Sequence, residues 1–468
     1  MLGTDQTGAS GSTGRPQTRP HDGNGHAGNG QPGDGSVPLA GPEPTADAIG
    51  QTVPTPMPTP ALDRCIGVSA TQFAQRYWSS APLLSPACGG AGIFADLLSL
   101  EAVDEMVSTR GLRTPFLRMA KNGSVLPNAT FTRSGGVGAG VTDQVADDKV
   151  LSRLADGATL VLQALHRTWP PLVRFGSALA AELGHPVQIN AYITPPQNQG
   201  FSAHYDTHDV FVLQVAGTKR WTIHRPVLDD PLPDQGWDHR KAQVAARATE
   251  KPLIDTLLAP GDALYLPRGY LHSAVAQGEV SVHLTVGVHP ITGYDLAREL
   301  LAAAADDREL RRSLPLGADP DALAEQVRAA ARRLAAVIDD AAVTDSAIAA
   351  VSRRVDRRVS RETRPAPIAP LAQLAAIGSL QPGTALRTRA GLRPSLRRAG
   401  NRLSLEVIDT TVNWPPETEG ALRLALSGAV FRPSELENLD PDEQLVVARR
   451  LLREGIVVPA EHVVPAGG

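Results

Sequence analysis

The chain has few of the residues that stabilise small secreted proteins or anchor a protein in a membrane. Its 468 residues include only two cysteines, Cys65 and Cys88, which fits a reducing compartment and leaves room for one disulfide at most. No apolar run approaches the length of a membrane span, and the first residues lack the apolar core of a signal peptide. The sequence therefore predicts a soluble cytoplasmic protein that has no membrane partner.

A large net charge is also missing. The formal charge at pH 7 is −4, so the molecule as a whole is not a basic nucleic-acid binder, and any such role must be local. The length exceeds what one compact core accommodates and predicts two or three domains. Residues 1–61 are rich in Gly, Pro, Ser and Thr and have too few apolar side chains to form a core, so we expect a disordered tail there.

A short motif in the middle of the chain offers two metal ligands on one side. His204 and Asp206 are separated by one residue, and because successive residues of a strand alternate between its faces, both side chains point the same way. A second imidazole follows at His272, after the apolar run 263–266 and a Pro-Arg-Gly turn. Two histidines and one carboxylate form the ligand set that holds Fe(II) and leaves coordination positions open. These three residues are the predicted metal ligands and catalytic centre.

A histidine and an aspartate separated by one residue also occur together by chance. The alternative interpretation of His204 and Asp206 is therefore a solvated pair on a turn. Lysine is rare in this chain, and the position of one lysine, Lys219, favours the metal site. Lys219 follows Ala216-Gly217-Thr218, which is predicted to be a tight turn that folds the next strand back as a hairpin. A compact, movable ammonium there suits a small dicarboxylate better than a planar guanidinium fork does.

Three segments together resemble the JmjC-type ribosomal oxygenases, which are Fe(II)- and 2-oxoglutarate-dependent protein hydroxylases of the cupin superfamily. These segments are Gln188 to Asp206, the stretch around Lys219, and Tyr265 to His272. The resemblance is specific over about residues 185–290, looser on both sides of this region, and absent before about residue 62.

This resemblance implies a mainly β catalytic core over residues 62–293, a double-stranded β-helix or jelly roll with flanking helices. In that fold His204, Asp206 and His272 meet at one mouth of the barrel. The resemblance further implies that 2-oxoglutarate chelates the iron as co-substrate, and that its far carboxylate reaches Lys219.

The strand periodicity agrees with a polar pocket wall. In the predicted strand Val187 to Thr194, Asn190 and Tyr192 share one face while apolar residues occupy the other. By the resemblance both side chains face the co-substrate pocket, and Thr285, on a second strand with the same alternation, is the hydroxyl expected nearby. Relatives often carry serine where this chain has Gly287, so the chain departs from the family at that position.

Three further side chains near the motif have other candidate roles. Gln163 and Tyr205 are expected either to contact the substrate or to form the wall and rim of the pocket. His208 shares a face with His204 but lies one strand repeat beyond Asp206, which favours an outer-sphere or solvent-facing position over a fourth metal ligand.

After about Tyr294 the composition becomes rich in Ala, Leu and Arg. Segments with a 3.6-residue apolar period at 295–312, 319–339 and 344–361 predict an α-helical region over residues 294–364. In the resembling family this region makes a homodimer.

Residues 371–468 show short strands, two helices and a last strand, an order that suits a winged helix, with which the resembling family ends. A local basic cluster makes nucleic-acid contact an alternative there to a structural or protein-binding role. The cluster consists of Arg387, Arg389, Arg393, Arg397, Arg398 and Arg402.

The sequence therefore favours a 2-oxoglutarate-dependent dioxygenase that hydroxylates a protein side chain, a histidine or an arginine of a ribosomal protein, and releases succinate and CO2. One alternative is a non-catalytic, cupin-type regulatory protein that binds nucleic acid through its winged helix. Another keeps the chemistry but acts on a peptide or a small metabolite. The complete set of His204, Asp206, Lys219 and His272 favours an enzyme, because a binding module need not keep all four.

Overall fold

The computed structural model describes residues 60–460 apart from 88–93, 122, 139, 318, 340–344, 346–347, 350, 353–354, 357–358, 360–361, 364 and 409. The tail expected over residues 1–61 lies outside the described residues except for its last two. Most of the helix expected over residues 344–361 also lies outside them.

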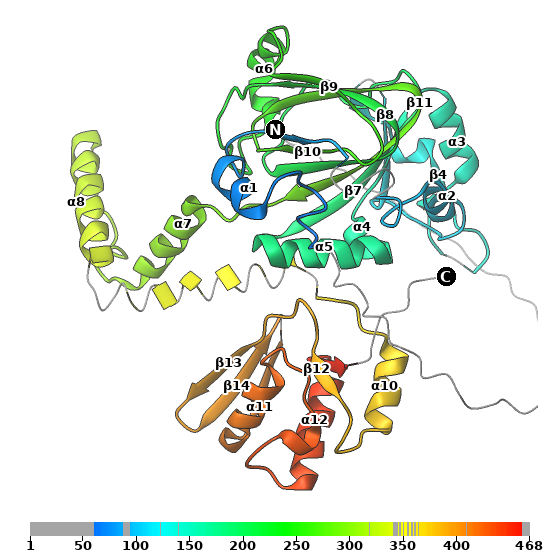
Figure 1. Ribbon diagram of the computed structural model, residues 1–468. Coiled ribbons are helices and arrows are strands. Elements are labelled where there is room, and N and C mark those ends of the chain that lie inside the picture. Colours follow the sequence, from blue (N-terminus) through cyan, green and yellow to red (C-terminus); the bar gives the residue numbers. More distant parts are fainter. Residues whose placement is uncertain are drawn as a thin grey trace, which may run out of the picture. The chain divides into compact units, whose positions relative to one another are not determined.

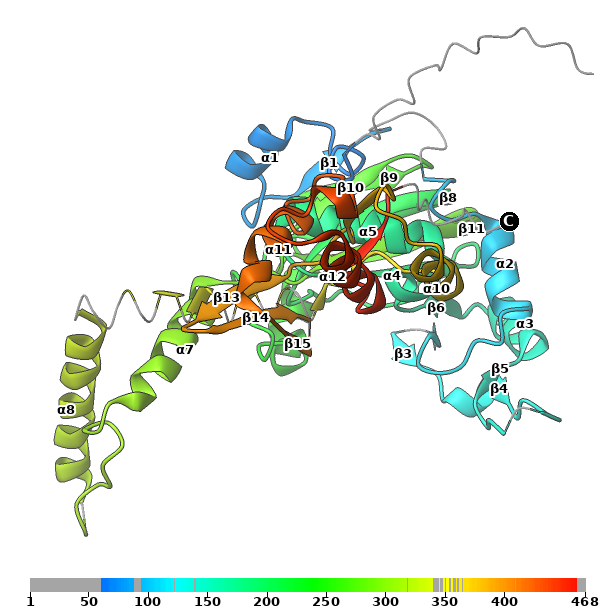
Figure 2. The same cartoon turned by 90° about the horizontal axis from the view of Figure 1, so that it is seen from below.

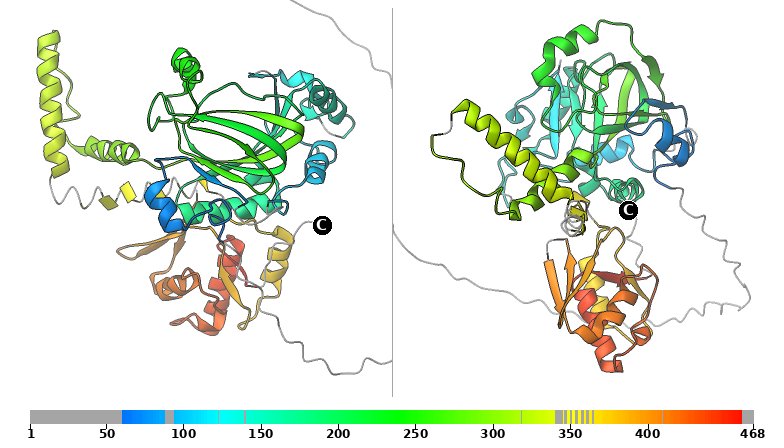
Figure 3. Two further views of the ribbon diagram at one scale, coloured as in Figure 1. Left: turned by 45° about the horizontal axis from the view of Figure 1, so that its top comes forward. Right: turned by 90° about the vertical axis from the view of Figure 1, so that its left-hand side faces the viewer.

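Residues 60–293 are built around an antiparallel sheet that curls into a barrel (Figure 1, Figure 3). Its strands are paired in the order β1-β10-β8-β11-β7-β6-β2-β3, and β9 pairs with β8 on the side of this path. The strand bounds are β1 Leu83–Ser85, β2 Leu117–Lys121, β3 Ser124–Val125, β6 Thr159–Leu162, β7 Val187–Thr194, β8 Asp209–His224, β9 Ile254–Leu258, β10 Ala263–Leu266 and β11 Leu271–Val288. A mainly β core with flanking helices, as expected from the sequence, is thus present.

The hairpin predicted at Ala216-Gly217-Thr218 is wrong, because β8 runs through these residues as one bent strand. Its first half pairs with β10 and its second half with β9, while the long strand β11 pairs with both halves. Gly217 allows the bend, since its φ is +60° and a Cβ there would lie 2.2 Å from the carbonyl oxygen of Val280. Lys219 therefore reaches the barrel interior along β8 itself.

The two faces of the central strands serve different purposes. On β7, Ile189, Ala191 and Ile193 pack into the main apolar core, whereas Tyr192 lies on the opposite face and lines a cavity in the barrel. Helix α5, Pro170–Leu183, contributes buried apolar residues to that main core. The barrel wall thus separates the main apolar core on its outside from an interior that contains a cavity lined by both polar and apolar side chains.

The described part of residues 60–293 also contains five other α-helices and one small sheet. Helix α2 begins after the cap Ser99, whose side chain accepts a hydrogen bond from the amide of Ala102. The helices are α1 Ala70–Arg76, α2 Leu100–Ser108, α3 Asp147–Ala155, α4 Leu165–Thr168 and α6 Lys241–Arg247, and the small sheet consists of β4 Thr132–Arg133 and β5 Gln144–Val145. Helices α2 and α3 lie next to each other (Figure 1, Figure 2).

Two further regions follow the barrel in the sequence. Helix α8, Pro320–Asp339, agrees with the helix expected over residues 319–339, whereas α7, Gly293–Ala303, covers only the first half of the helix expected over residues 295–312. The last region has its own apolar core and contains α10 Pro370–Gly378, β12 Leu386–Thr388, β13 Ser395–Ala399, β14 Arg402–Val407, β15 Thr410–Trp414, α11 Glu419–Ala425, α12 Pro441–Arg453 and β16 Val457–Pro459. Among the described residues, none of the helices combines the length and the apolar character that a bilayer crossing requires.

Candidate metal and co-substrate site

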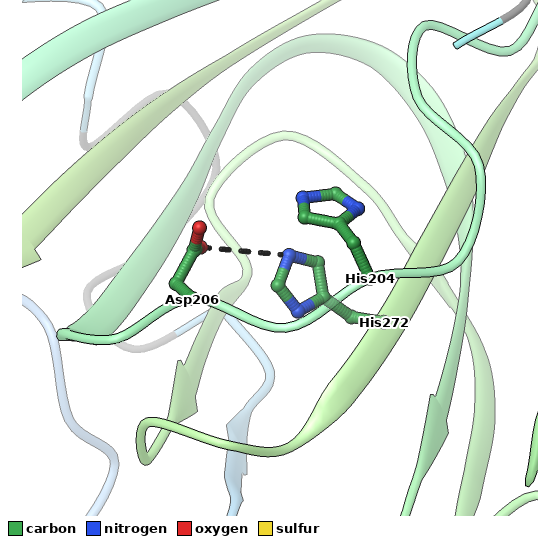
Figure 4. Close-up of side chains that lie close together, drawn as sticks. All are labelled: His204, Asp206 and His272. Atoms are coloured by element: carbon green, nitrogen blue, oxygen red, sulfur yellow. Dashed lines mark ion pairs between the residues drawn. The ribbon is translucent and has the colours of Figure 1, made fainter. Parts of the chain in front are cut away.

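The three predicted metal ligands lie together. His204 and Asp206 belong to the extended segment before β8, and His272 is the second residue of β11. One ligand atom from each lies within 4.8 Å of the others, and Asp206 Oδ2 is 3.7 Å from His272 Nε2 (Figure 4). The backbones of His204 and His272 exchange two hydrogen bonds, of 3.2 and 2.8 Å. Long-range strand pairing therefore joins ligands that are 68 residues apart in sequence.

Backbone carbonyl groups fix the orientation of both imidazoles. His204 Nδ1 lies 2.7 Å from the carbonyl oxygen of Ser202, and His272 Nδ1 lies 3.2 Å from that of Tyr270. Because a carbonyl oxygen only accepts, each Nδ1 must carry the proton and donate it. The lone pair then resides on Nε2, which is the nitrogen left for a metal.

The electrostatics favour the protonation states that ligands require. Burial opposes ionisation of Asp206, but the nearby histidines, His208 first, together hold the pKa of this carboxyl below its usual value. Burial, assisted by His204, lowers the pKa of His272 to about 4. At neutral pH the site therefore holds a carboxylate and neutral imidazole, the forms that bind a divalent cation. This donor set fits Fe(II).

A cavity of about 80 Å³ adjoins these residues inside the barrel. Its lining includes Tyr192, Lys219 and Thr285, three of the predicted co-substrate contacts. Tyr192 stacks on His283, with ring centroids 5.0 Å apart and planes 8° apart. The cavity therefore has a polar end at the lysine and a stacked aromatic wall.

Lys219 is only 4% exposed. Its Nζ donates a hydrogen bond of 3.1 Å to Thr194 Oγ1, which also accepts a bond of 3.2 Å from Thr159 Oγ1. Among the described residues no carboxylate forms an ion pair with Lys219, and burial lowers its pKa to about 7. A buried ammonium that lacks a counter-ion is stabilised by a carboxylate from outside the chain, and this position is suited to bind one.

The hydroxyl groups of Thr194 and Thr159, which lie beside Lys219, were not predicted from the sequence, which indicated Thr285. Thr194 shares a strand face with Asn190 and Tyr192, so alternation was a usable signal for it. Thr159 carried no comparable signal, because its position depends on the pairing of β6 with β7.

Three of the predicted site residues, Asn190, Gln163 and Tyr205, form hydrogen bonds with backbone groups outside the cavity. The side chain of Asn190 accepts a 3.0 Å hydrogen bond from the amide of Ala164 and does not line the cavity. Gln163 donates to the carbonyl oxygen of Pro115 and is likewise outside the lining.

Tyr205 is 1% exposed and donates a 2.8 Å hydrogen bond to the carbonyl oxygen of Gln235. It lies between His204 and Asp206 and so projects to the opposite side of the extended segment, where it packs with Val244. Tyr205 is also absent from the lining of the cavity, so its position supports neither of the two expected roles, substrate contact or pocket wall.

His208 is not part of the group of candidate ligands. Its Nδ1 lies 3.2 Å from the carbonyl oxygen of Asp209. A Cβ on Gly287 would lie 2.9 Å from His208 Cε1, so the glycine provides the space that the imidazole occupies. A side chain at residue 287 and the observed position of His208 therefore exclude each other unless one of them moves.

A buried carboxylate supports the turn between β10 and β11. Asp209 is fully buried and accepts hydrogen bonds of 2.9 Å from the hydroxyl of Tyr265 and from the amide of Arg268. The next residue of the turn, Gly269, donates its amide to the carbonyl oxygen of Asp206 at 3.0 Å. This network connects the backbone of one metal-ligand candidate to the turn that leads to His272.

Comparison with known proteins shows what this region is similar to. Residues 168–296 match the family model of the JmjC domain. The chain is 30% identical to ribosomal oxygenase 1 of Gallus gallus over 52% of this chain and 40% of that protein. It is 31% identical to the bifunctional lysine-specific demethylase and histidyl-hydroxylase NO66 of Drosophila grimshawi over 53% of this chain and 34% of that protein. The resemblance identified over residues 185–290 is thus confirmed.

Solved structures give a further comparison. The crystal structure of the Escherichia coli ribosomal oxygenase YcfD aligns with 84% of this chain and 98% of that chain, at 18% identity and a TM-score of 0.47. Another structure of YcfD, in complex with cobalt and 2-oxoglutarate, aligns with 84% of this chain and 99% of that chain at a TM-score of 0.45. The chain spans less than half the length of the two curated relatives above.

Proposed function

We propose that this chain, which carries a JmjC domain over residues 168–296, is an Fe(II)- and 2-oxoglutarate-dependent dioxygenase that hydroxylates a protein side chain. The observation that carries the proposal is that His204, Asp206 and His272 line one cavity together with the buried Lys219, which forms no ion pair with any described residue. A fixed metal-ligand set and a separate carboxylate anchor are what such a reaction requires of the protein.

In this proposal His204, Asp206 and His272 hold the iron through two Nε2 atoms and a carboxylate oxygen. When bound, iron with 2-oxoglutarate and O2 supplies the oxidative decarboxylation to succinate and CO2 that drives C–H hydroxylation. The chain contributes orientation, because carbonyl groups lock both imidazoles. It also shields one ligand from bulk water, since His272 is only 8% exposed, whereas His204 and Asp206 are half-buried and leave the metal site accessible from one side.

Lys219 binds the far carboxylate of 2-oxoglutarate, with Thr194 as its hydrogen-bond partner. Tyr192 and Thr285 form the adjoining cavity wall. Asn190 is left out of the binding set because its amide oxygen already accepts a backbone hydrogen bond.

The substrate is a histidine or an arginine of a ribosomal protein, which is consistent with the names of two relatives, ribosomal oxygenase 1 and the bifunctional lysine-specific demethylase and histidyl-hydroxylase NO66. The catalytic domain extends over residues 62–293 and the enzyme is cytoplasmic. Residues 294–364 form the dimerisation region of a homodimer, in which the exposed side chains of Leu301 and Val327 are candidates for burial.

Residues 371–468 form a winged-helix domain whose role is structural or protein-binding. Two members of its basic cluster are already engaged, since Arg397 pairs with Glu406 at 3.1 Å and Arg398 pairs with Glu419 at 2.9 Å. Neutralisation by these acids weakens the case for a nucleic-acid contact.

The first test is release of succinate from 2-oxoglutarate. Anaerobically Fe(II)-loaded protein is exposed to O2 with and without a ribosomal protein extract, and the mass of each extracted protein is then examined for a gain of one oxygen. We expect release that increases with the extract. No release together with no retained iron would contradict the proposal and favour the non-catalytic, nucleic-acid-binding alternative.

Substitutions separate the two halves of the site. His204→Ala and Asp206→Ala should each abolish iron retention and turnover together, whereas His239→Ala, at an exposed histidine, should change neither. Lys219→Ala should leave iron bound but raise the 2-oxoglutarate concentration needed for half-maximal rate by about 100-fold, as for loss of a buried charge-assisted hydrogen bond. Full activity of a ligand variant would refute the metal assignment.

A further inference from the structure

A hollow on the outside of the barrel has no part in the site described above. It has a volume of about 620 Å³ and lies between helices α2 and α3, with β6, β7 and β11 also contributing to its lining. Leu160 and Ile193 lie among these lining residues and are 1% and 5% exposed. We call this hollow, lined by residues of α2 and α3 and by Leu160, Ile193 and Val280, the α2–α3 groove.

Apolar side chains that face solvent gather at this groove. Leu151 of α3 is 67% exposed, Leu100 of α2 is 46% exposed and Val280 of β11 is 43% exposed. Apolar groups that surround a hollow of this size favour an occupant that removes them from water, with a gain of about 25 cal/mol per Å² of buried area.

All the charged side chains that line the α2–α3 groove are acidic. Its lining includes Asp104, Asp147 and Asp148 and no lysine, arginine or histidine. Asp148 pairs with Arg133, whereas Asp104 and Asp147 form no ion pair with any described residue. Two carboxylates beside an apolar floor are complementary to a segment that carries both apolar and cationic side chains.

The groove is on the reverse side of the co-substrate end of the cavity. Leu160 and Ile193 line the groove, while their neighbours in sequence, Thr159 and Thr194, form the hydrogen-bonded pair at Lys219. Adjacent residues of a strand face opposite ways, so β6 and β7 form both the floor of the groove and part of the cavity wall.

We propose that the α2–α3 groove is a docking site for a basic, amphipathic segment of the protein substrate, separate from the residue that is hydroxylated. The inference rests on the proposed function for the nature of the partner, because proteins that bind ribosomal RNA are rich in lysine and arginine. Apolar side chains of that segment lie on Leu151 and Val280, and its cations lie beside Asp104 and Asp147. The substrate class is thereby narrowed to basic proteins that contain an apolar stripe next to the target.

Binding is measured on the metal-free full chain, so that the result does not depend on turnover. The probe is a fluorescein-labelled peptide of leucine and lysine with leucines at helical spacing, and its binding is followed by fluorescence anisotropy at low and moderate salt. Two comparison peptides replace every lysine by glutamate or every leucine by serine. The Leu/Lys peptide alone should bind, and more weakly as salt increases.

Leu151→Asn should weaken binding of the Leu/Lys peptide by about tenfold, the effect of losing roughly 1.4 kcal/mol of apolar burial. The pair Asp104→Asn and Asp147→Asn should weaken binding by about threefold and reduce its salt dependence. Leu371→Asn is the matched control, because Leu371 is 83% exposed on α10 and lies outside the groove.

Equal binding of the glutamate peptide, or an unchanged affinity of the Leu151→Asn protein, would overturn the proposal. Self-association of the chain that Leu151→Asn abolishes would assign the groove to a second copy and also overturn it. With iron-loaded protein and ribosomal extract, Leu151→Asn should raise the extract concentration for half-maximal succinate release and leave substrate-free turnover unchanged. Peptide binding without any succinate release would reject the oxygenase and retain the groove.

Discussion

Replacing Lys219 by methionine should make the metal-free protein more stable. Burial lowers the pKa of this lysine from its ordinary 10.5 to about 7. A pKa difference of about 3.5 corresponds to about 5 kcal/mol of unfavourable free energy for the charged form in the folded protein. Methionine retains the apolar stem without the charge, so Lys219→Met removes this cost.

The stabilisation by Lys219→Met depends on pH. Between pH 7 and 10.5 the unfolded chain binds more protons at this lysine than the folded chain does, so the stability of the wild type increases with pH. The cost of Lys219 is about 5 kcal/mol at pH 6, where both states are charged, and about 2 kcal/mol at pH 9, where the folded state is neutral. The advantage of Lys219→Met must therefore shrink as the pH increases.

Thermal unfolding in the presence of a chelator measures this difference. Structural relaxation and water penetration reduce the cost of burying a charge. Even if only half of the cost at pH 6 remains, its removal in Lys219→Met raises the melting temperature by about 5 °C for a domain of this size. Lys251→Met, at an exposed lysine, controls for the loss of a positive charge. A Lys219→Met protein that melts no higher than the wild type at pH 6, or whose advantage is independent of pH, would refute the reasoning.

Three further predictions concern residues around the site. Asp209→Asn should lower the free energy of unfolding by about 3 kcal/mol, because buried donors lose a charged acceptor, and should weaken iron retention in competition with a chelator. Gly287→Ser should cost about 1–3 kcal/mol through the short contact with His208, and a Gly287→Ser, His208→Ala double variant should recover most of this in chemical denaturation. Tyr205→Phe should cost about 1 kcal/mol through loss of its bond to Gln235 while kcat and KM stay unchanged; an altered KM would restore its role as a substrate contact.

Local patterns in the sequence predicted several elements well. Strand β7 has the predicted bounds, Val187–Thr194, because strict alternation of apolar and polar residues marks a strand with two different faces. Helix α12 is one of the two helices expected over residues 371–468, and it begins after Asp440, whose side chain accepts a hydrogen bond from the amide of Glu443 in a capping box. Such signals lie within a few residues of each other and need no knowledge of the rest of the fold.

The hairpin predicted at Gly217 was wrong because the conformation there depends on residues that are distant in sequence. A glycine between small or polar residues is equally compatible with a tight turn and with a bent strand. The choice depends on Val280, 63 residues later, whose carbonyl oxygen approaches the glycine too closely for any side chain. No pattern near residue 217 carries that information.

The sequence by itself determined which chemistry the chain has available, namely two imidazoles, one carboxylate and a scarce lysine at spacings that favour a metal and a dicarboxylate. Only the tertiary structure decided how they are used. It joined His204 to His272 through backbone pairing, buried Lys219 beside Thr194, and engaged Asn190 with a backbone amide. The physical reason is that side-chain alternation is local, whereas strand pairing and burial depend on residues that are distant in sequence.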